Sequence, residues 1–330
     1  MDCCQPAKTP RWNACLQVTQ GLGMNSLARV VIAGGSGALG LRIAANFAAL
    51  GHEVFILTRK VSESIPFQQV AWDGRTIEES WANLVPGSIL VNLSGELVDR
   101  RPTPENIDLL KSSRVVPTKA LVEASKVFGA PSLWLQMSTL AIYGDAGELR
   151  LDETSAPADG PEQMAGVARV WEEALQPIED CRMVFLRTGI VLDRGTPALN
   201  RLVTITKMFL GGSVASGKQW VSWIHIEDFI AAINFIIANE PLQGPVHLTS
   251  PNPIRNEELM ATLRRVLRMP WSPPTPEFVI RLGARFIFTT DPMLALSGRR
   301  AFPDKLTSAG FAFRQPAIRQ ALDNLCENLP

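Results

Sequence analysis

Four glycines follow a short apolar run near the beginning of the chain and could form a phosphate-binding turn. The run Arg29–Ala33 is rich in β-branched residues, and glycines follow at positions 34, 35, 37 and 40. Apolar residues then recur at helical spacing as far as Leu50. A buried parallel strand, a glycine turn and a helix together make the phosphate site of dinucleotide-binding folds. The sequence therefore predicts a nucleotide site at this turn, facing the free N–H groups of the helix.

The residues after the second apolar run indicate which dinucleotide would bind. Val54–Leu57 is typical of a buried strand, and Thr58, Arg59 and Lys60 follow it without a carboxylate. NAD-binding folds usually place an acidic residue there, which binds the ribose 2′-OH. The guanidinium of Arg59 could instead bind a 2′-phosphate, with the hydroxyl of Thr58 as a second donor. We therefore predict NADP rather than NAD; the simpler alternative is a basic pair on the surface.

The fourth apolar run, Ser88–Leu93, brings another polar residue to the end of a strand. Ser94 and Gly95 follow Leu93 directly. Ligands of open α/β sheets bind at the carboxyl ends of the strands, so we predict that Leu93 and Ser94 contact the cofactor. The alternative is a simple turn.

The fifth apolar run, Ser132–Met137, is followed by hydroxyl side chains that could take part in catalysis. The hydroxyl of Ser138 or Thr139 could hydrogen-bond a substrate oxygen, although ordinary capping of the strand end is equally compatible with them. Tyr143, the single tyrosine of the chain, comes shortly afterwards. It could act as an acid, or it could pack beneath the site.

Length and charge bound the class of protein. The 330 residues suffice for one large or two modest domains. Lysine plus arginine equals aspartate plus glutamate at 32 each, so no broad charged surface for nucleic acid or an acidic membrane is expected. The longest nearly uncharged stretch, Phe229–Ala238, is too short to span a bilayer. Five cysteines and three histidines show no metal-ligand spacing, so we predict no metal site.

Alternating strands and helices are needed to bring these residues to one edge of a sheet. Besides the runs above, strands are predicted over 69–72 and 183–187, and helices over 41–50, 104–128 and 166–178. This alternation predicts an α/β fold with a parallel, doubly wound sheet of the Rossmann type.

The pattern loosens after residue 192, and six prolines punctuate residues 251–276. We predict a disordered tail over 1–23, an NADP-binding domain over 24–192 and a smaller mixed region over 193–330 that forms the substrate pocket. Within that region 220–250 is expected to return to the sheet, and helices are predicted over 256–267 and 316–325. The tail lacks the apolar core of a secretory signal, so we expect a cytoplasmic protein, or one in an organelle stroma or matrix if the source is a eukaryote.

Several longer stretches form a combined pattern. They are Ala33–Gly40, Gly51–Arg59, Val91–Glu96, Tyr143–Asp145, Leu186–Leu192, Ser216–Ile226, Ser250–Pro253 and Phe302–Leu306. On these stretches the chain resembles the extended short-chain dehydrogenase/reductase superfamily. More closely, it is similar to the atypical sugar-nucleotide-epimerase-like family that carries a C-terminal domain of unknown function. The resemblance extends from about residue 28 to 325.

The resemblance implies a set of binding residues. NADP contacts are implied at Gly34, Gly35, Ser36, Gly37, Ala38, Leu39, Thr58, Arg59, Leu93, Ser94, Arg114 and Val191. It also implies that the C-terminal region closes over the nicotinamide. Lys218 and Gln219 are then the best candidates to contact a polar or phosphorylated substrate, with Arg299 and Arg300 as more distant ones. His225, at a predicted strand-to-helix junction, either lines this pocket or is a structural group.

The usual acid/base pair of this superfamily is missing. Its enzymes use a tyrosine and a lysine four residues further on, and the lysine lowers the tyrosine pKa for proton transfer. Residues 164–172, where the pair belongs, contain neither, and Gly147 stands four residues after Tyr143. The catalytic candidates are therefore Ser138, Thr139 and Tyr143, with Arg169 and Glu172 as weaker replacements on the crossover helix.

We therefore predict an NADP-binding oxidoreductase or epimerase-like protein that acts on an unidentified small molecule, with no nucleic-acid or membrane partner. The alternative is a non-catalytic NADP-binding regulator, either redox-sensing or linked to cell or plastid division, because such a protein would not need the missing pair.

Overall fold

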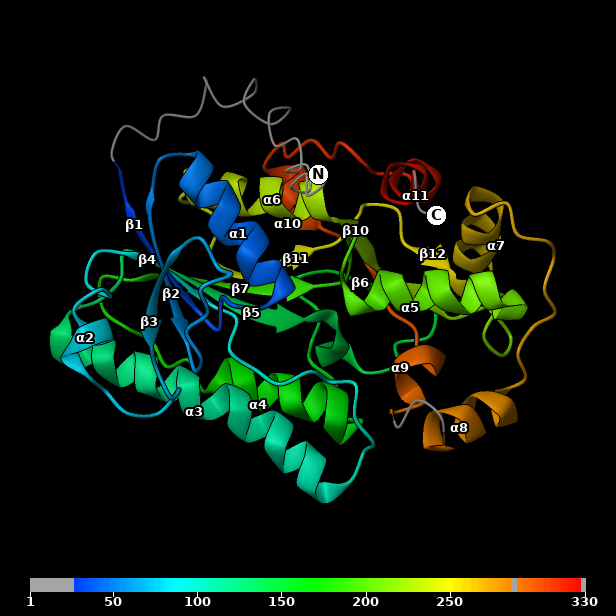
Figure 1. Cartoon of the computed structure of the whole chain (residues 1–330), viewed down its shortest axis with the longest axis horizontal. Coiled ribbons are helices and arrows are strands. Elements are labelled where there is room, and N and C mark those ends of the chain that lie inside the picture. The colour runs from blue at the N-terminus through cyan, green and yellow to red at the C-terminus, as the bar shows by residue number, and fades with distance from the viewer. Residues whose placement is uncertain (1–26, 287–289, 328–330) are drawn as a thin grey trace, which may run out of the picture.

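A seven-stranded parallel sheet forms the centre of the computed structural model, which describes residues 27–286 and 290–327 (Figure 1). The strand order is β11-β7-β5-β4-β1-β2-β3. These strands are β1 (Arg29–Ala33), β2 (Glu53–Thr58), β3 (Gln68–Ala71), β4 (Ile89–Asn92), β5 (Leu133–Thr139), β7 (Arg182–Thr188) and β11 (Gly244–Leu248). The chain builds outward from β1 to β3 and then crosses back to β4, so the predicted doubly wound α/β fold is confirmed.

Helices cover both faces of this sheet (Figure 1). Helices α1 (Ala38–Ala49) and α6 (Ile226–Ala238) pack on one face, and α3 (Pro104–Phe128) and α4 (Val167–Glu173) pack on the other. The short helix α2 (Glu79–Ala82) lies beside α3. Because both faces of the strands are buried, the strands read as continuous apolar runs in the sequence.

Each face of the sheet has its own apolar core. On the α1 side, Ile32, Phe47 and Phe229 are completely buried in one cluster. On the α3 side, Trp81 and Trp134 are completely buried in a second cluster. Neighbouring residues of one strand contribute to opposite clusters, as the alternation of a strand requires. The predicted strands therefore lie where their hydrophobicity indicated.

Three predicted helix boundaries are wrong. The helix expected over 41–50 is α1, which begins at Ala38 because Gly37 is its N-cap. The helix expected over 166–178 is α4, which is preceded by one π turn, η2 (Glu162–Gly166), and ends earlier because Pro177 disfavours helix in the residues before it. The helix expected to begin at Pro316 is α11 (Ile318–Cys326). The carbonyl of Pro316 lies outside that helix, because it accepts hydrogen bonds from side chains of the 250–252 turn.

The remaining elements are helices and two-stranded sheets, most of which follow residue 192. The strand pairs are β8 (Ile190–Leu192) with β10 (Trp223–His225), β9 (Trp220–Val221) with β12 (Ile254–Arg255), and β6 (Arg150–Leu151) with β13 (Arg300–Ala301). The helices are α5 (Pro197–Ile205), η3 (Thr206–Leu210), α7 (Asn256–Val266), α8 (Glu277–Phe286), α9 (Met293–Leu296), α10 (Asp304–Ser308) and α11. In Figure 1, α5, α7, α8 and α9 lie to the right of the large sheet.

The domain division that we predict at residue 192 stays a prediction. Strand β11, which lies within the 220–250 segment expected to return to the sheet, pairs with β7 in the large sheet. The predicted tail over 1–23 lies outside the described residues.

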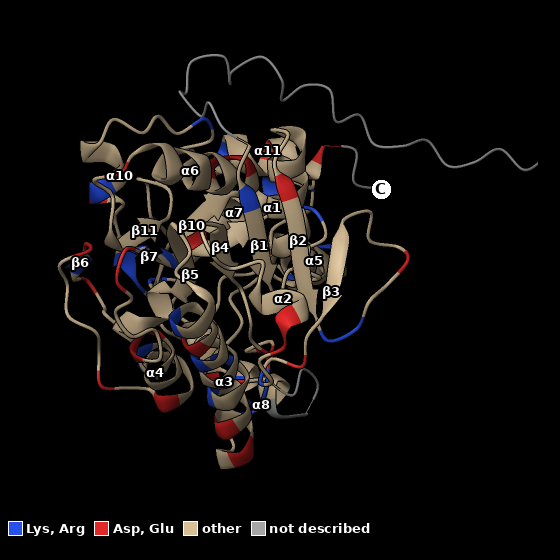
Figure 2. Cartoon of the chain, turned by 90° about the vertical axis from the view of Figure 1, so that its left-hand side faces the viewer, with Lys and Arg blue, Asp and Glu red and all other residues tan. Residues whose placement is uncertain are grey.

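Charged residues lie mainly on helices and loops, and both signs occur along α3 (Figure 2). The strands carry few of them; Arg29 and Glu53, at the starts of β1 and β2, face each other at 3.7 Å. Among the helices that the structure describes, none is long and apolar enough to cross a membrane.

Candidate functional site

The turn between β1 and α1 depends on glycine at two positions. Gly34 has a φ of +72°, and a Cβ atom there would lie 2.9 Å from Cα of Ser94. At Gly40 a Cβ atom would lie 2.5 Å from Cα of Gly35, so α1 can approach the turn only without a side chain. Gly37, in contrast, has open space around it, and no side chain caps α1. The helix N-terminus is therefore open to the phosphates of a dinucleotide.

The loop after β4 closes one side of this turn. Leu93 donates its backbone N–H to the carbonyl of Ala33 at 2.9 Å, so the loop is fixed at the end of β1. The hydroxyl oxygen of Ser94 is buried without a hydrogen-bond partner. Buried polar groups are rarely left unpaired in native proteins, so this hydroxyl fits a site that a bound ligand completes. Leu93 and Ser94 thus lie where the sequence placed them.

The end of β2 closes the other side. The hydroxyl of Thr58 lies 3.3 Å from the Oγ of Ser36 in the glycine turn. Arg59 is largely exposed, and its Nη2 lies 3.0 Å from Oε1 of Glu96 in the loop after β4. Sequence reasoning did not identify Glu96 as a site residue, because no local pattern links two residues that are 37 positions apart.

Arg114 on α3 fixes the loop after β4 by hydrogen bonds. Its Nη2 donates to the carbonyl of Glu96 at 2.8 Å, and its Nη1 donates to the carbonyl of Leu110 at 3.0 Å. Burial lowers the pKa of Arg114 to about 10, so the guanidinium is still cationic at neutral pH. Its position against the loop is established, whereas the predicted NADP contact stays a prediction. The predicted NADP contact of Val191, which is buried in β8, likewise stays a prediction.

The three predicted catalytic residues gather at the end of β5 but have different surroundings. Ser138 is buried, and its Oγ donates to Oε1 of Glu172 at 2.5 Å. Thr139 is partly exposed, and its Oγ1 accepts from the N–H of Ala141, which caps the 3₁₀ helix η1 (Leu140–Tyr143). Tyr143 is buried. Of the three hydroxyl groups, that of Thr139 is therefore the one accessible to a substrate.

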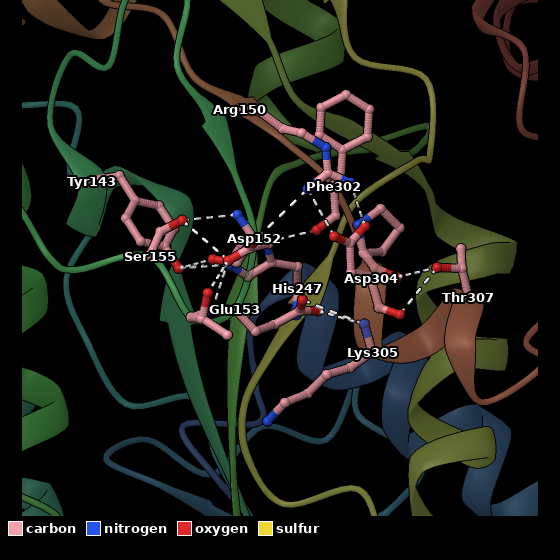
Figure 3. A network of polar contacts seen from close by, with 12 residues as sticks. Tyr143, Arg150, Asp152, Glu153, Ser155, His247, Phe302, Asp304, Lys305 and Thr307 are labelled. Atoms are coloured by element: carbon pink, nitrogen blue, oxygen red, sulfur yellow. Dashed lines mark hydrogen bonds and ion pairs between the residues drawn. The ribbon is translucent and has the colours of Figure 1, made fainter.

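Tyr143 belongs to a buried polar network (Figure 3). Its hydroxyl lies 2.6 Å from Nε2 of His247, whose Nδ1 lies 2.9 Å from the carbonyl of Phe302. Because that carbonyl can only accept, Nδ1 carries the proton and Nε2 accepts from the tyrosine. Burial raises the pKa of Tyr143 to about 12 and lowers the pKa of His247 to about 4. These shifts keep both groups neutral, which favours the packing interpretation of Tyr143 over the acid.

A buried ion pair continues this network toward β5. Arg187 donates to both carboxylate oxygens of Glu172, at 3.0 and 2.8 Å, and its Nη1 donates to the hydroxyl of Tyr143 at 2.8 Å. Glu172, a weak catalytic candidate in the sequence, therefore has its carboxylate occupied. The other weak candidate, Arg169, pairs instead with exposed Asp159.

The same network reaches the C-terminal region (Figure 3). The carboxylate of Glu153 accepts from the backbone N–H of His247 at 3.1 Å and from that of Lys305 at 3.3 Å. Together with the bond from His247 to Phe302, these contacts join β11 to the segment that leads into α10.

Two predicted substrate residues lie on the 213–219 loop. Lys218 is exposed. The amide of Gln219 donates to the carbonyls of Val214 and Ala295 at 3.1 and 3.0 Å, so it ties that loop to α9. Lys218 is therefore the more available of the two for a ligand.

The third predicted substrate residue, His225, is buried at the strand-to-helix junction that the sequence indicated. Its Nδ1 accepts from the N–H of Glu227 and caps α6, and its Nε2 lies 3.1 Å from Oδ1 of Asn324 on α11. Both ring nitrogens are occupied, which weighs against the predicted substrate contact and favours the structural alternative.

Arg299 approaches the π turn that precedes α4, within the segment that lacks tyrosine and lysine. Its Nη2 lies 3.0 Å from Oγ of Ser297 and 3.7 Å from Sδ of Met164, and its buried Nε has no partner. Burial lowers the pKa of Arg299 to about 10, so it stays cationic at neutral pH. The sequence named this residue only as a distant possibility, because the contact joins residues 135 positions apart.

Within the described ranges, no cluster of three or more histidine, cysteine, aspartate or glutamate residues could hold a metal ion. The doubly wound sheet, the glycine turn and the open helix N-terminus define a dinucleotide-binding protein with a Rossmann-type fold. Residues 30–247 match the NAD dependent epimerase/dehydratase family, and residues 275–325 match a domain of unknown function, DUF1731. The chain belongs to the NAD dependent epimerase/dehydratase family, which confirms the resemblance seen in the sequence.

Relatives from plants and bacteria align over most of the chain. The chloroplastic SDR39U1 homolog of Arabidopsis thaliana is 31% identical and covers 89% of this chain and 85% of its own length. The epimerase family protein YfhF of Bacillus subtilis is 30% identical and covers 90% of this chain and 97% of its own length. Both are described as epimerase family proteins.

Solved structures show the same fold. Human epimerase family protein SDR39U1, solved with NADPH, superposes with a TM-score of 0.80 at 26% identity, over 91% of this chain and all of that one. A nucleoside-diphosphate sugar epimerase from Corynebacterium glutamicum gives 0.72 at 29% identity, over 91% of this chain and 58% of that one.

Proposed function

We propose that the chain binds NADPH or NADP at the turn between β1 and α1. The observation that carries this proposal is the exposed cation of Arg59 at the end of β2, beside a turn whose Gly37 leaves open space. The unpaired hydroxyl of Ser94 provides a further donor on the opposite side of the turn. The NADPH in the related human structure supports the choice of the phosphorylated dinucleotide.

The proposed reaction is an oxidoreductase or epimerase-like step on a small molecule held between the strand ends and the C-terminal region. When bound, the nicotinamide would give or take a hydride. The hydroxyl of Thr139 donates a hydrogen bond to the substrate oxygen, and the cation of Arg299 stabilises negative charge that develops on it. Ser138 and Tyr143 fix the end of β5 through their hydrogen bonds to Glu172, Arg187 and His247.

A substrate with an anionic group suits this arrangement, because Lys218 is exposed and Arg299 is cationic. The sugar-nucleotide epimerase from Corynebacterium makes a sugar-nucleotide-like molecule the first class to screen. In this proposal residues 24–192 carry the cofactor, and residues from 193 onward complete the substrate pocket.

Calorimetric titration of the full chain with NADPH, NADP, NADH and NAD tests the cofactor proposal. We expect Arg59→Ala to weaken NADPH and NADP about tenfold or more, because a hydrogen-bonded charge pair contributes about 1.5–3 kcal/mol. The affinity for NADH and NAD should change little. Equal losses for all four would contradict the 2′-phosphate role, and no binding of any by the unmodified chain would contradict the nucleotide site.

A further inference from the structure

The ion pair between Arg59 and Glu96 crosses the glycine turn. Arg59 follows β2, Glu96 follows β4, and β1 lies between these two strands in the sheet. The N–H of Gly34 donates to the carbonyl of Leu57 on one side, and Leu93 donates to β1 on the other. Both flanking loops are thus fixed beside the turn, and the pair spans the side from which a dinucleotide would enter.

The backbone of Glu96 is held more firmly than the side chain of Arg59. Its N–H donates to Oγ of Ser113 at 3.1 Å, and its carbonyl accepts from Arg114 at 2.8 Å, both on α3. The side chain of Arg59 is 76% exposed, against 25% for Glu96. A ligand that enters here can therefore move the arginine, whereas the carboxylate stays in place.

The carboxylate of Glu96 is ionised at neutral pH. The hydrogen bond from Arg59 lowers its pKa, and Nη2 of Arg100 lies 3.2 Å from its second oxygen. Glu96 thus places a negative charge beside the same cation that would bind a 2′-phosphate.

We propose that Glu96 determines the selectivity of this site between NADP and NAD, an inference that rests on the proposed cofactor function. From the loop after β4 it supplies the carboxylate that NAD-binding folds place at the end of β2. With NADP, the 2′-phosphate takes Arg59 away from Glu96 and is repelled by the carboxylate. With NAD, the ribose 2′-OH donates to Glu96 while Arg59 remains paired with it. The Arg59–Glu96 pair therefore lowers the ratio of NADP affinity to NAD affinity below the value that Arg59 alone would give.

The test is the variant Glu96→Gln, which removes the charge and nearly preserves the shape. Calorimetry with NADPH and NADH should show NADPH binding about tenfold more tightly, because a like charge a few ångströms away is removed, and NADH binding more weakly. Glu123→Gln is the matched control, since it removes an equal charge from the exposed pair with Lys126 on α3. It should leave both affinities unchanged.

Two fragments confine the measurement to the adenosine end of the site. Adenosine 2′,5′-bisphosphate should bind Glu96→Gln more tightly than the unmodified chain, whereas AMP should not. An unchanged ratio of NADPH to NADH affinity in Glu96→Gln would overturn the role of Glu96. Failure of the unmodified chain to bind any of these nucleotides would instead overturn the proposed cofactor function, so the two failures are distinguishable.

Discussion

Three hydroxyl groups within six residues at the end of β5 serve different purposes. Ser138 donates to the buried ion pair, and Tyr143 lies between Arg187 and His247. Thr139 is partly exposed, and its oxygen accepts a hydrogen bond from the N–H of Ala141. Its hydroxyl proton is therefore available to donate to a substrate. The chemistry of a side chain at this strand end thus depends on its direction from the strand.

Replacing Tyr143 with phenylalanine tests its structural role. We expect the free energy of unfolding to fall by about 1–3 kcal/mol, because Arg187 and His247 each lose a buried partner. Urea unfolding measures this change. NADPH affinity should remain that of the unmodified chain, and a loss of affinity without a loss of stability would contradict the structural role.

Thr139→Val is the matching test of a substrate contact. It removes a partly exposed hydroxyl and the cap that it forms with the N–H of Ala141, whereas Tyr143→Phe leaves two buried groups without a partner. The loss of stability should therefore stay below that of Tyr143→Phe. NADPH oxidation with any substrate found in a carbonyl and sugar-nucleotide screen should fall about tenfold or more, as for loss of a hydrogen bond made to the reacting oxygen. Unchanged turnover would remove Thr139 from the site.

At the scale of elements, the site depends on how closely α1 approaches the end of β1. Gly40 lies inside that contact, whereas Gly37 lies outside it, at the open N-terminus of the helix. Gly40 therefore serves the packing of α1 on β1, whereas Gly37 serves the binding of phosphate at the helix N-terminus.

The variants Gly37→Ala and Gly40→Ala should divide accordingly. Gly40→Ala brings a methyl group against the backbone of Gly35, so we expect a loss of about 1–3 kcal/mol in stability together with weaker NADPH binding. Gly37 has a φ of −80°, which alanine adopts, so Gly37→Ala should unfold at the same temperature or higher. Its methyl group would nevertheless face the pyrophosphate and weaken NADPH about tenfold or more. Thermal unfolding and calorimetry of both variants measure these effects, and full NADPH affinity in Gly37→Ala would refute the phosphate position.

At the scale of the whole molecule, one buried network joins segments distant in the sequence. It extends from Glu172 on α4 through Arg187 on β7 and Tyr143 to His247 on β11, and from there to the carbonyl of Phe302. The sheet and the C-terminal segment therefore share one set of hydrogen bonds, so a change in the protonation of His247 should affect the stability of the whole fold.

The unfolding of the chain should depend on pH through His247. Its pKa is about 4 in the fold and 6.5 in an ordinary environment, so the unfolded chain takes up the proton first as the pH falls. Its contribution is therefore fully present above pH 6.5 and is lost as the pH falls toward 4, by about 3 kcal/mol. Urea unfolding between pH 7 and 4 measures this slope. In His247→Gln the slope should be shallower; an identical slope would assign the effect to other groups.

The sequence by itself determined the doubly wound sheet, the glycine turn and the strand ends at which polar residues gather. These features are local, because apolar runs, glycine spacing and helical periodicity act over a few residues. Thr58, Arg59, Leu93 and Ser94 could be placed in advance, since the carboxyl ends of neighbouring parallel strands meet at one edge.

Only the tertiary structure decided what each of those side chains contacts. The pairing of Arg59 with Glu96, the approach of Arg299 to Met164 and the capping role of His225 join residues from different elements or depend on burial. Whether a hydroxyl is accessible, as in Thr139, or enclosed, as in Tyr143, depends on packing between those elements. Spacing along the chain contains no information about such contacts, because the packing of the whole fold determines which side chains meet.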